Sequence, residues 1–513
     1  MQTTTEEFNL TDELEKIETG QGGCEQVDYS FFAQAKKIYD LATEGESGAA
    51  KVFTGFQRGK FCYDHASRQW FKFNGSHWEL DYVNEVLSRV ESVATEYAKV
   101  AKHFAAAKTE AIQANDNPAE NDYKELENDT LKAMRRLLNL KTRENVLTLA
   151  AAGKDSLGIT GNEWDRDPWV LGCKNGVIDL KTGELKSGKP EDYIKTVAPV
   201  EWQGIDASCP LWERFLLEIF NGDTDTTDFM QRLFGYSITG TCKEHIYPVA
   251  WGIGRNGKGT TFEVLSSVLG ELAGPMESEM ILEQKFKRHS GGPASDIIHL
   301  RGKRIVWASE SGEGRNLDSG KLKWLTGGDT LTGRAPYGRR QVTFRPTHTL
   351  FLLTNHKPHA NTDDYALWNR VLLIPFTLSF VDEPTAANER KKDGDLADKL
   401  KAEASGILAW LVRGCLEYQR IGLSPPESIK AATREYQQDE DILGHFIEDC
   451  CILGDNLEVK AGDLYQAYVK WCGEMGHKAM SGTRFGREMK RRFDSYKPNY
   501  VFYIGIGLRA NGL

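Results

Sequence analysis

Short apolar runs alternate with glycine-rich turns and amphipathic stretches through the middle of this sequence. Four of these runs have the length of a buried strand and end at turn signals or polar residues: 246–251, 304–309, 349–354 and 371–376. The stretch after the first run, TTFEVLSSVLGEL, has the apolar spacing of a helix. Strands that alternate with helical patterns are typical of parallel sheets covered by helices. The pattern therefore predicts an α/β core over residues 206–385.

Before this core, the pattern changes twice. Residues 1–55 are polar and glycine-rich apart from one amphipathic helical stretch, and we expect a flexible N-terminal arm there. The next residues alternate with period two and contain Asn74-Gly75, a strong signal for a two-residue hairpin turn. Helical patterns follow over 83–150, and short strand-like segments then return. We therefore expect an α+β accessory domain over 56–205.

After the core, the pattern is mainly helical. We expect a helical connector over 386–438 and a separate domain over 439–513. In this last domain three helical segments precede YVFYIGIGL, which alternates like a pair of strands. Three helices followed by a hairpin predict a winged helix, in which the third helix faces the groove of DNA. The arginines on one face of that helix, which could contact either DNA or a second subunit, are Arg484, Arg487 and Arg491.

The composition is that of an ordinary globular protein and excludes several classes. The chain has 513 residues, and its 64 lysines and arginines against 74 aspartates and glutamates give a net charge of −10. This balance argues against a protein that coats nucleic acid over its whole surface, but it permits a local basic channel. No apolar run approaches the roughly 18 residues of a membrane span. The polar start, MQTTTEEFNL, is unlike a secretory signal, and nine cysteines without a Cys-x-x-Cys pair fit a reducing cytoplasm.

The turn after the first strand has the features of a phosphate-binding loop. Gly252 to Lys258 follow the spacing G-x-x-x-x-G-K, and a helical pattern begins directly after the lysine. Glycines let backbone N–H groups converge on a phosphate, a helix N-terminus adds its positive end, and the lysine reaches the β- and γ-phosphates. Gly259 stands where a hydroxyl normally binds Mg²⁺, so Thr260 or Thr261 must supply it. The candidate ATP-binding residues are Gly252, Gly254, Asn256, Gly257, Lys258, Gly259, Thr260 and Thr261.

The same glycines also satisfy G-x-G-x-x-G, the fingerprint of a dinucleotide-binding site. Such a site needs a second apolar strand that leads into an acidic residue. Glu271 has the right distance from the glycines, but it lies in LGELAG, which reads as a helix end followed by a turn. The lysine and the missing strand favour a nucleoside triphosphate, and NAD binding is the alternative.

Polar residues also flank the other predicted strands of the core. Glu310 ends RIVWASE in the manner of a Walker B acid, so it can polarise the attacking water and, with Thr260, hold Mg²⁺. Asn355 ends the next strand, where an amide can hold the γ-phosphate and the water. Arg370 precedes the fourth strand, and we interpret it as an arginine finger rather than as a plain surface arginine.

Together these motifs resemble one known family. GIGRNGKGTTF, RIVWASE, KLKWLTGGDTLTGRAPYGRR, LFLLTNHKP and WNRVLLIPF look like the ordered motifs of superfamily 3 helicases of the phage/plasmid and poxvirus primase-helicase type. The resemblance covers residues 60–513 and implies an AAA+-like ATPase that assembles as a ring, usually a hexamer, around DNA. It implies Lys258 as the Walker A lysine, Glu310 as the Walker B acid and Asn355 as sensor 1. By the same resemblance, Arg370 reaches the ATP of the neighbouring subunit.

The segment between Walker B and sensor 1 is basic within this acidic chain. Residues 301–345 contain ten basic and four acidic side chains, a local balance of +6. Positive groups at a channel wall bind phosphates without reading the base sequence. The family resemblance places a DNA-contacting hairpin here, whereas the alternative is a solvated basic surface. The candidate DNA-binding residues are Arg334, Arg339, Arg340 and Arg345, with Arg339 and Arg340 at the expected tip.

The sequence thus predicts an ATP- and Mg²⁺-dependent DNA helicase that acts on single-stranded or forked DNA in the replication of a phage, plasmid or other mobile element. We expect it in the cytoplasm of a bacterial host. The alternatives are an ATP-gated initiator that binds an origin without processive unwinding, and the helicase part of a primase-helicase. The segment before the accessory domain is too short for a polymerase-type core, so we expect no primer synthesis. A separate primase or initiator is a candidate partner.

Overall fold

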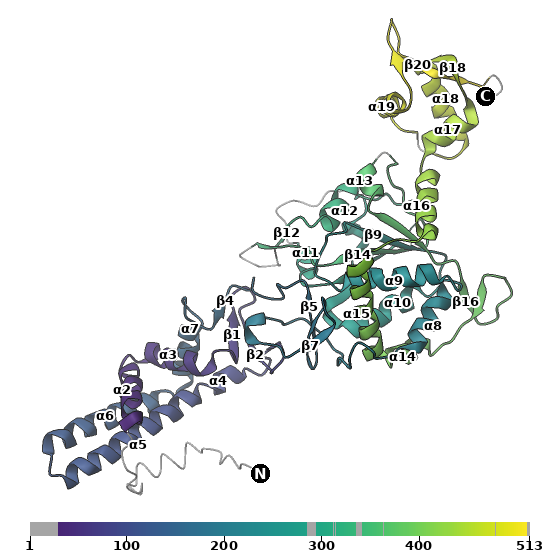
Figure 1. Cartoon of the computed structure of the whole chain (residues 1–513). Helices are drawn as coiled ribbons and strands as arrows, with labels where there is room; N and C mark the ends of the chain where they lie inside the picture. The colour runs from purple at the N-terminus through teal and green to yellow at the C-terminus, as the bar shows by residue number, and fades with distance from the viewer. Residues whose placement is uncertain are drawn as a thin grey trace. The chain divides into compact units, whose positions relative to one another are not determined.

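The computed structural model describes residues 29–284, 294–310, 312, 314–334, 341–362, 364–477 and 479–509. The chain divides into two compact units, Met1–Gly204 and Ile205–Leu513, each with its own apolar core (Figure 1). This division falls where the sequence predicts a boundary, near residue 205. Both units mix helices and strands, and the main sheet is parallel. The predicted α/β class is confirmed at this level.

The first unit contains helices that share one apolar core. These helices are α2 (Tyr29–Thr43), α3 (Glu46–Gln57), α4 (Glu85–Ser88), α5 (Glu91–Gln113), α6 (Asn117–Arg136) and α7 (Leu140–Ala150). Ala35 of α2 and Phe53 of α3 are buried in the same cluster as Val93 and Phe104 of α5. The expected flexible arm is therefore wrong for residues 34–55. Small aliphatic side chains and the rings of Tyr39 and Phe53 give α2 and α3 an apolar face that the average polarity of the segment conceals.

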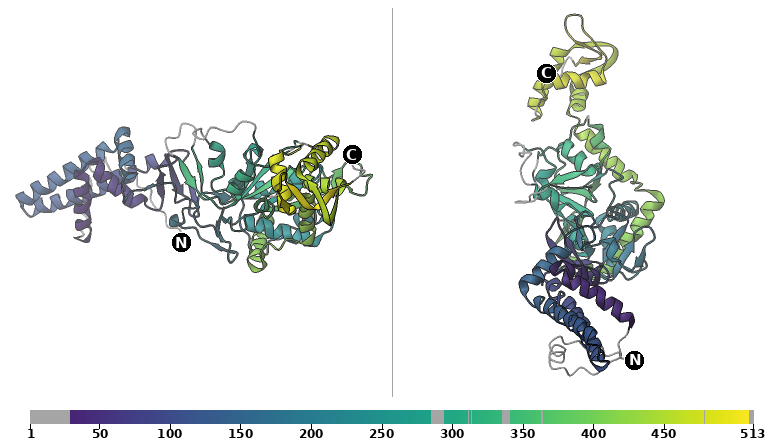
Figure 2. Two further views of the ribbon diagram at one scale, coloured as in Figure 1. Left: turned by 90° about the horizontal axis from the view of Figure 1, so that it is seen from above. Right: turned by 90° about the vertical axis from the view of Figure 1, so that its left-hand side faces the viewer.

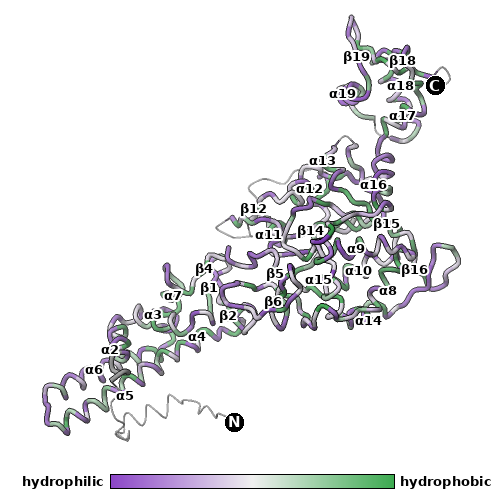
Figure 3. Tube along the Cα trace, in the orientation of Figure 1, coloured by the Kyte–Doolittle hydropathy of each residue, from purple (hydrophilic) through white to green (hydrophobic). Residues whose placement is uncertain are grey.

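Helices α5 and α6 run side by side as a long antiparallel hairpin (Figure 2). The backbone turns between them because Asp116 accepts a hydrogen bond from the N–H of Ala119 and Pro118 stands in the first turn of α6, where a missing N–H costs little. Most positions along α6 are hydrophilic (Figure 3). Only a narrow stripe that includes Leu131 and Met134 is buried, so packing against α5 determines the position of this helix.

Two small sheets complete the first unit. One has the order β3-β2-β1-β4 and the other the order β7-β6-β5-β8. Their strands are β1 (Phe61–Asp64), β2 (Gln69–Phe73), β3 (Trp78–Leu80), β4 (Gly158–Ile159), β5 (Val170–Cys173), β6 (Gly176–Asp179), β7 (Glu184–Lys186) and β8 (Val197–Ala198). A hairpin is present at Asn74-Gly75, since β2 and β3 pair antiparallel and Gly75 has a φ of 102°. The predicted two-residue turn is wrong, because Phe73 lies opposite Trp78 and the loop therefore spans 74–77.

The second unit is built on a parallel sheet with the order β10-β11-β14-β9-β15. Its strands are β9 (Tyr247–Trp251), β10 (Ala273–Met276), β11 (Ile305–Glu310), β14 (Thr349–Thr354) and β15 (Val371–Pro375). Four of them are the predicted apolar runs, and β10 is an additional edge strand. Every residue of β14 is buried, because helices cover both faces of the sheet. This burial explains why its sequence is a nearly continuous apolar run.

The two faces of the sheet carry different helices. Phe234 of α9 (Thr224–Ser237) and Phe262 of α10 (Lys258–Leu269) pack against Phe351 of β14. On the opposite face, Leu322 of α12 (Ser319–Thr326) is buried in one cluster with Leu352. Further helices are α8 (Pro210–Ile219), α14 (Leu396–Lys401) and α15 (Ala404–Ile421), which pack with α9 and α10, and α11 (Ser295–His299), α13 (Tyr365–Trp368) and α16 (Glu427–Asp439), which lie with α12 (Figure 1).

Two ribbons extend from this core. Strands β12 (Leu331–Gly333) and β13 (Val342–Phe344) pair antiparallel, and strands β16 (Ser379–Val381) and β17 (Glu389–Lys391) pair in parallel. The first ribbon lies where the sequence predicts a hairpin between Walker B and sensor 1. Its tip, 335–340, is outside the described residues.

The last part of the chain has its own apolar core. Its elements are α17 (Ile442–Cys450), β18 (Cys451–Lys460), α18 (Ala461–Glu474), α19 (Gly482–Arg492), β19 (Ser495–Tyr496) and β20 (Phe502–Leu508), with the strand order β18-β20-β19. The three helices are those expected from the sequence, but YVFYIGIGL is not a pair of strands. It forms the single strand β20, which pairs with β19 before it and with β18. Strand β18 was not expected. Most of its residues are exposed and several are charged, so the sequence lacks the alternation of apolar and polar residues that predicts a strand. None of the described helices has the length and hydropathy that a membrane crossing requires.

Acidification is expected to destabilise the second unit through His348, which directly precedes β14. The side chain is only 3% exposed, and neither ring nitrogen has a hydrogen-bond partner among the described residues. Burial lowers the pKa of His348 to about 4, whereas an unfolded histidine titrates near 6.5. Above pH 6.5 the ring is neutral in both the folded and the unfolded protein, so it does not reduce the free energy of unfolding. As the pH falls from 6.5 towards 4, only the unfolded protein binds the proton, and stability is lost. Between pH 7 and pH 5 we expect a loss on the order of 2 kcal/mol.

The measurement is thermal or urea unfolding of the wild type and of His348→Leu at both pH values. The leucine variant should lose less stability than the wild type on acidification. Equal losses in the two proteins would show that His348 does not contribute to the pH dependence.

Candidate nucleotide site

The loop between β9 and α10 is held in one conformation by packing and side-chain hydrogen bonds. Gly257 has a φ of 86°, and a Cβ atom there would approach Cγ2 of Ile219 in α8 to 2.7 Å, so only glycine fits. The buried side-chain amide of Asn256 donates to the carbonyls of Ile253 (3.2 Å) and Phe376 (3.3 Å). These bonds tie the loop to the residue after β15. The loop is therefore preorganised rather than shaped only when a ligand binds.

Lys258 begins α10 and turns its side chain back into this loop. The residue is 6% exposed, and its ammonium group donates to the carbonyl of Gly252, a neutral acceptor. Desolvation lowers the pKa of Lys258 to about 8, and no described carboxylate offsets the effect. An anion beside this amine would gain a charge-assisted hydrogen bond in a partly dry environment. The loop thus offers a positive group where the sequence predicts the β- and γ-phosphates.

The two threonines after Lys258 differ in their surroundings. Thr261 is fully buried, and its hydroxyl donates to the carbonyl of Gly257 (3.0 Å), one helical turn earlier. Thr260 is half-buried, and within the described part of the chain its hydroxyl makes no hydrogen bond. Gly259 has open space where a Cβ atom would stand. Of the two hydroxyls that the sequence left open, Thr260 is the one that is free to bind a ligand.

Strand register brings the other two predicted groups to the same edge of the sheet. Glu310 of β11 lies opposite Thr354 of β14, which in turn lies opposite Trp251 of β9. The next residues after Thr354 and Trp251 are Asn355 and Gly252, and the N–H of Gly252 donates to the carbonyl of Thr354 (3.2 Å). The side chain of Asn355 is exposed. The strand before it, β14, lies between β9, which leads into the loop, and β11, which ends at Glu310. The loop, Asn355 and the backbone of Glu310 therefore share the carboxyl edge, where ligands bind in open α/β sheets.

Arg370 lies at the opposite edge of the sheet. It precedes β15, and its carbonyl accepts a hydrogen bond from the N–H of Tyr247, the first residue of β9. The length of β9, at about 3.3 Å per residue, separates Arg370 from the loop by roughly 15 Å. Its Nη1 donates to the carbonyl of Ala366 in α13 (2.6 Å), and its Nε is buried without a hydrogen-bond partner among the described residues. Within one chain, Arg370 therefore does not belong to the site formed by Lys258.

The predicted DNA-binding arginines occupy two regions. Arg334 directly follows β12 and Arg345 directly follows β13, and both side chains are exposed. Arg339 and Arg340 lie outside the described residues. The basic ribbon predicted from the sequence thus has exposed arginines next to both of its strands, while its tip is not described.

The arginines of α19 are exposed, while Phe485 and Met489 of the same helix are buried, as the predicted apolar face requires. Arg484 donates to the side-chain oxygen of Asn361 (2.8 Å), and Arg491 pairs with Glu488 (3.0 Å). Two of the three candidate arginines therefore already have partners within the chain. Among the described residues, Arg487 has no such partner.

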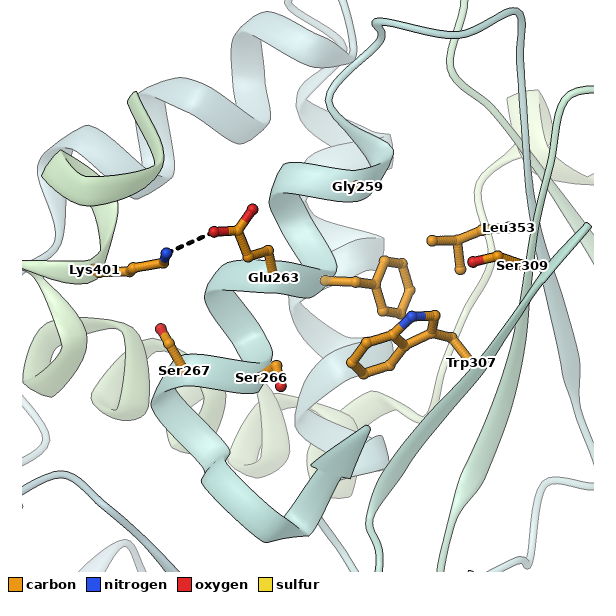
Figure 4. Close-up of a pocket in the computed structure, with 9 residues that line it drawn as sticks. Gly259, Glu263, Ser266, Ser267, Trp307, Ser309, Leu353 and Lys401 are labelled. Carbon is orange, nitrogen blue, oxygen red and sulfur yellow. Dashed lines mark hydrogen bonds and ion pairs between the residues drawn. The ribbon is translucent and has the colours of Figure 1, made fainter. Parts of the chain in front are cut away.

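A cavity of about 460 Å³ adjoins the loop on the α10 side of the sheet (Figure 4). Its floor is aromatic, with the rings of Phe262 and Trp307 5.4 Å apart, and Lys401 of α14 pairs with Glu263 at one wall (2.6 Å). The remaining lining residues are Gly259, Ser266, Ser267, Ser309 and Leu353. This cavity could not be predicted from the sequence, because its residues come from four elements and only their helical spacing along α10 is visible there.

Sequence models of protein families match three segments of the chain. Residues 50–221 match "D5 N terminal like", residues 250–370 match "Family of unknown function (DUF5906)", and residues 438–502 match "Poxvirus D5 protein-like". The middle match contains the loop, Glu310 and Asn355 and ends at Arg370.

Curated relatives match most of the chain at low identity. A protein of Acanthamoeba polyphaga mimivirus named "Putative helicase" is 27% identical over 468 residues, which are 86% of this chain and 48% of that protein. A Frog virus 3 protein of the same name is 23% identical over 524 residues, 82% of this chain and 53% of that protein. An African swine fever virus protein named "Putative primase" is 22% identical over 460 residues, 82% of this chain and 46% of that protein.

The chain spans about half the length of these curated relatives. It is similar to D5-like helicase and primase proteins of large DNA viruses. These viruses infect eukaryotes, so the comparisons do not support the bacterial host that the sequence analysis expected. Among solved structures, the apo C-terminal region of NrS-1 matches with a TM-score of 0.34 and 12% identity, over 67% of this chain and 100% of that one. A likeness this weak carries no conclusion.

Proposed function

We propose that this chain is the ATP-dependent motor of a D5-like, superfamily 3 replication helicase that acts as a ring, with six subunits as the expected number. The observation that supports this proposal most strongly is the division of the catalytic groups between two edges of one sheet. Lys258, Asn355 and the end of β11 lie at the carboxyl edge, whereas Arg370 lies at the amino edge. A complete hydrolytic site would therefore need two copies of the chain.

The residues at the carboxyl edge suit ATP hydrolysis. The loop N–H groups and Lys258 would hold the β- and γ-phosphates, and Asn355 would orient the attacking water. Thr260 has a hydroxyl that is free to meet a cation, and Glu310 ends β11, on the far side of β14 from β9, at the same end of the sheet. We assign these two as the Mg²⁺-binding residues, and Glu310 also as the group that polarises the water. The chemistry that Mg²⁺ supplies when bound is neutralisation of charge on the β- and γ-phosphates.

The DNA-binding role rests on charge and on exposed arginines. The β12–β13 ribbon would reach into the ring channel through Arg334, Arg339, Arg340 and Arg345, where it would contact phosphates of one strand without reading bases. Helix α19, with Arg484, Arg487 and Arg491, would form a second contact through the winged-helix arrangement. Relatives named as helicases and as a primase fit a replication role. Priming would then come from a separate primase or from a part of a longer protein.

A strand-displacement assay tests the proposal. Purified protein with ATP and Mg²⁺ should release a labelled strand from a forked duplex, and a Lys258→Ala protein should not. An origin-binding initiator would instead bind duplex DNA and hydrolyse ATP poorly without unwinding an extended fork. Binding of NAD in preference to ATP would favour the dinucleotide alternative, and both outcomes would overturn the helicase assignment.

Alkaline pH is expected to weaken ATP binding. The pKa of Lys258 is lowered to about 8 by burial, so the free loop loses its positive charge as the pH rises through 8. Binding of an anion favours the protonated amine, and the affinity should therefore be highest below pH 8 and fall by up to about tenfold per pH unit above it.

Equilibrium binding of a fluorescent ATP analogue between pH 7 and 9.5 measures this effect. The matched control is Lys258→Arg, which keeps its charge over this range and should give a flatter profile. A wild-type affinity that is constant up to pH 9.5 would mean that the charge of Lys258 does not contribute to binding.

A further inference from the structure

We propose that the cavity beside α10 is the docking site for Tyr365 of a second copy of this chain. This inference rests on the proposed function, because it names the contact that would bring Arg370 of one subunit to the ATP of the next. It assigns a partner and an anchoring residue to a cavity that shares only Gly259 with the candidate nucleotide site.

Tyr365 is available for such a contact. It begins α13, and its side chain is 77% exposed, which is unusual for a large aromatic residue. The next residue, Ala366, accepts the hydrogen bond from Nη1 of Arg370 (2.6 Å). The guanidinium group of Arg370 and the ring of Tyr365 therefore belong to one small surface. A partner that receives Arg370 must also meet Tyr365.

The cavity cannot be filled by Tyr365 of the same chain. Helix α13 packs through Leu367 and Trp368 into the cluster that contains Leu352, on one face of the sheet. The cavity lies on the other face, with Leu353 and Trp307 among its lining residues. Because successive residues of a strand point to opposite faces, the body of the sheet separates the two. Only a second copy can bring Tyr365 to the cavity.

The position of the cavity along α10 is consistent with a tyrosine that lies next to Arg370 of the partner. Along α10, the cavity begins at Gly259, directly after Lys258, and continues to Ser267, which is about 12 Å at 1.5 Å per residue. The guanidinium group of Arg370 bonds the carbonyl of Ala366, so it lies next to the backbone of Tyr365. With the guanidinium group at a phosphate beside Lys258, the tyrosine would lie over the first turns of α10. That position is the aromatic part of the cavity.

The chemistry of the cavity suits a tyrosine. Phe262, Trp307 and Leu353 supply an apolar floor for the ring, and the hydroxyls of Ser266 and Ser309 lie on the walls, where they can bond the phenol oxygen (Figure 4). Aromatic side chains that fill a partner's pocket are frequent anchors of protein interfaces.

Cysteine cross-linking tests the contact directly. The 513-residue chain with Tyr365→Cys and Ser266→Cys should form covalent dimers and larger species on oxidation with ATP analogue present. Each single variant and the unchanged parent should not form them. A Tyr82→Cys, Ser266→Cys protein is the matched control, since Tyr82 is equally exposed (87%) but lies in the first unit. No cross-link above the control level would overturn the proposal.

The dependence of ATPase activity on protein concentration distinguishes a failure of this docking site from a failure of the proposed function. Tyr365→Ala should raise the protein concentration needed for half-maximal ATPase activity by roughly tenfold or more, with turnover restored at high concentration. The variant should fold like the wild type, because Tyr365 is exposed and no core contact is removed. If Tyr365→Ala behaves like wild type while Arg370 is still shared between subunits, the docking site is wrong and the proposed function stands. If a monomer hydrolyses ATP at the wild-type rate, both are wrong.

Discussion

Replacing Lys258 with alanine is expected to reduce ATP turnover by at least about two orders of magnitude. Lys258 is the first residue of α10. Its amine donates to the carbonyl of Gly252, at the level where the phosphates would bind. Removing it withdraws a positive charge that would stabilise the negative charge developing on the transferred phosphoryl group. Steady-state ATPase measurements with and without forked DNA provide the readout.

Folding should not suffer from this substitution. Lys258 is a buried amine whose pKa is lowered by desolvation, so its removal relieves an unfavourable charge. The unfolding temperature of Lys258→Ala should be equal to that of the wild type or higher. The control is Lys399→Ala, which removes an exposed lysine of α14 paired with Asp393 and should leave turnover unchanged. Wild-type turnover by Lys258→Ala would contradict the assignment of the nucleotide site.

Replacing Arg370 with alanine is expected to abolish turnover while ATP still binds. An arginine finger is worth about 10³–10⁵ in rate where it acts. ATP affinity should change by no more than a few-fold, because Arg370 lies at the other edge of the sheet from the loop of its own chain. The measurements are ATPase assays together with equilibrium binding of a fluorescent nucleotide.

The comparison protein for this experiment is Arg420→Ala. Arg420 is an exposed arginine of α15 that pairs with Glu417, one turn away on the same helix, and its loss should affect neither property. A large loss of ATP affinity in Arg370→Ala would indicate that this arginine acts within its own subunit. Unchanged turnover would remove it from the mechanism.

The sequence predicted the parallel sheet and the strand ends that carry the candidate residues because both depend on local patterns. Apolar runs buried on two faces are visible without a structure, and each of them ends at a polar residue such as Glu310 or Asn355. Strands that are all parallel place these ends at one edge, so the residues meet there. The separation of Arg370 follows from the same rule, since this residue stands before its strand rather than after it.

Other features depend on contacts between distant segments and could not be predicted. Helices α2 and α3 belong to the first core through a few small side chains, which the average polarity of 1–55 conceals. The choice between Thr260 and Thr261 depends on the helical phase of α10, which turns one hydroxyl into the protein and leaves the other free. Strand β18 is mostly exposed and is fixed by pairing with β20.

The most direct test of a shared active site is to mix Lys258→Ala with Arg370→Ala. Each protein alone should be inactive, but a mixed ring contains interfaces where an intact loop from one subunit meets an intact Arg370 from the other. We predict that ATPase activity appears on mixing, depends on the ratio of the two proteins and is greatest near equal amounts. Mixtures that stay as inactive as the separate proteins, although the two variants are shown to assemble together, would contradict the account.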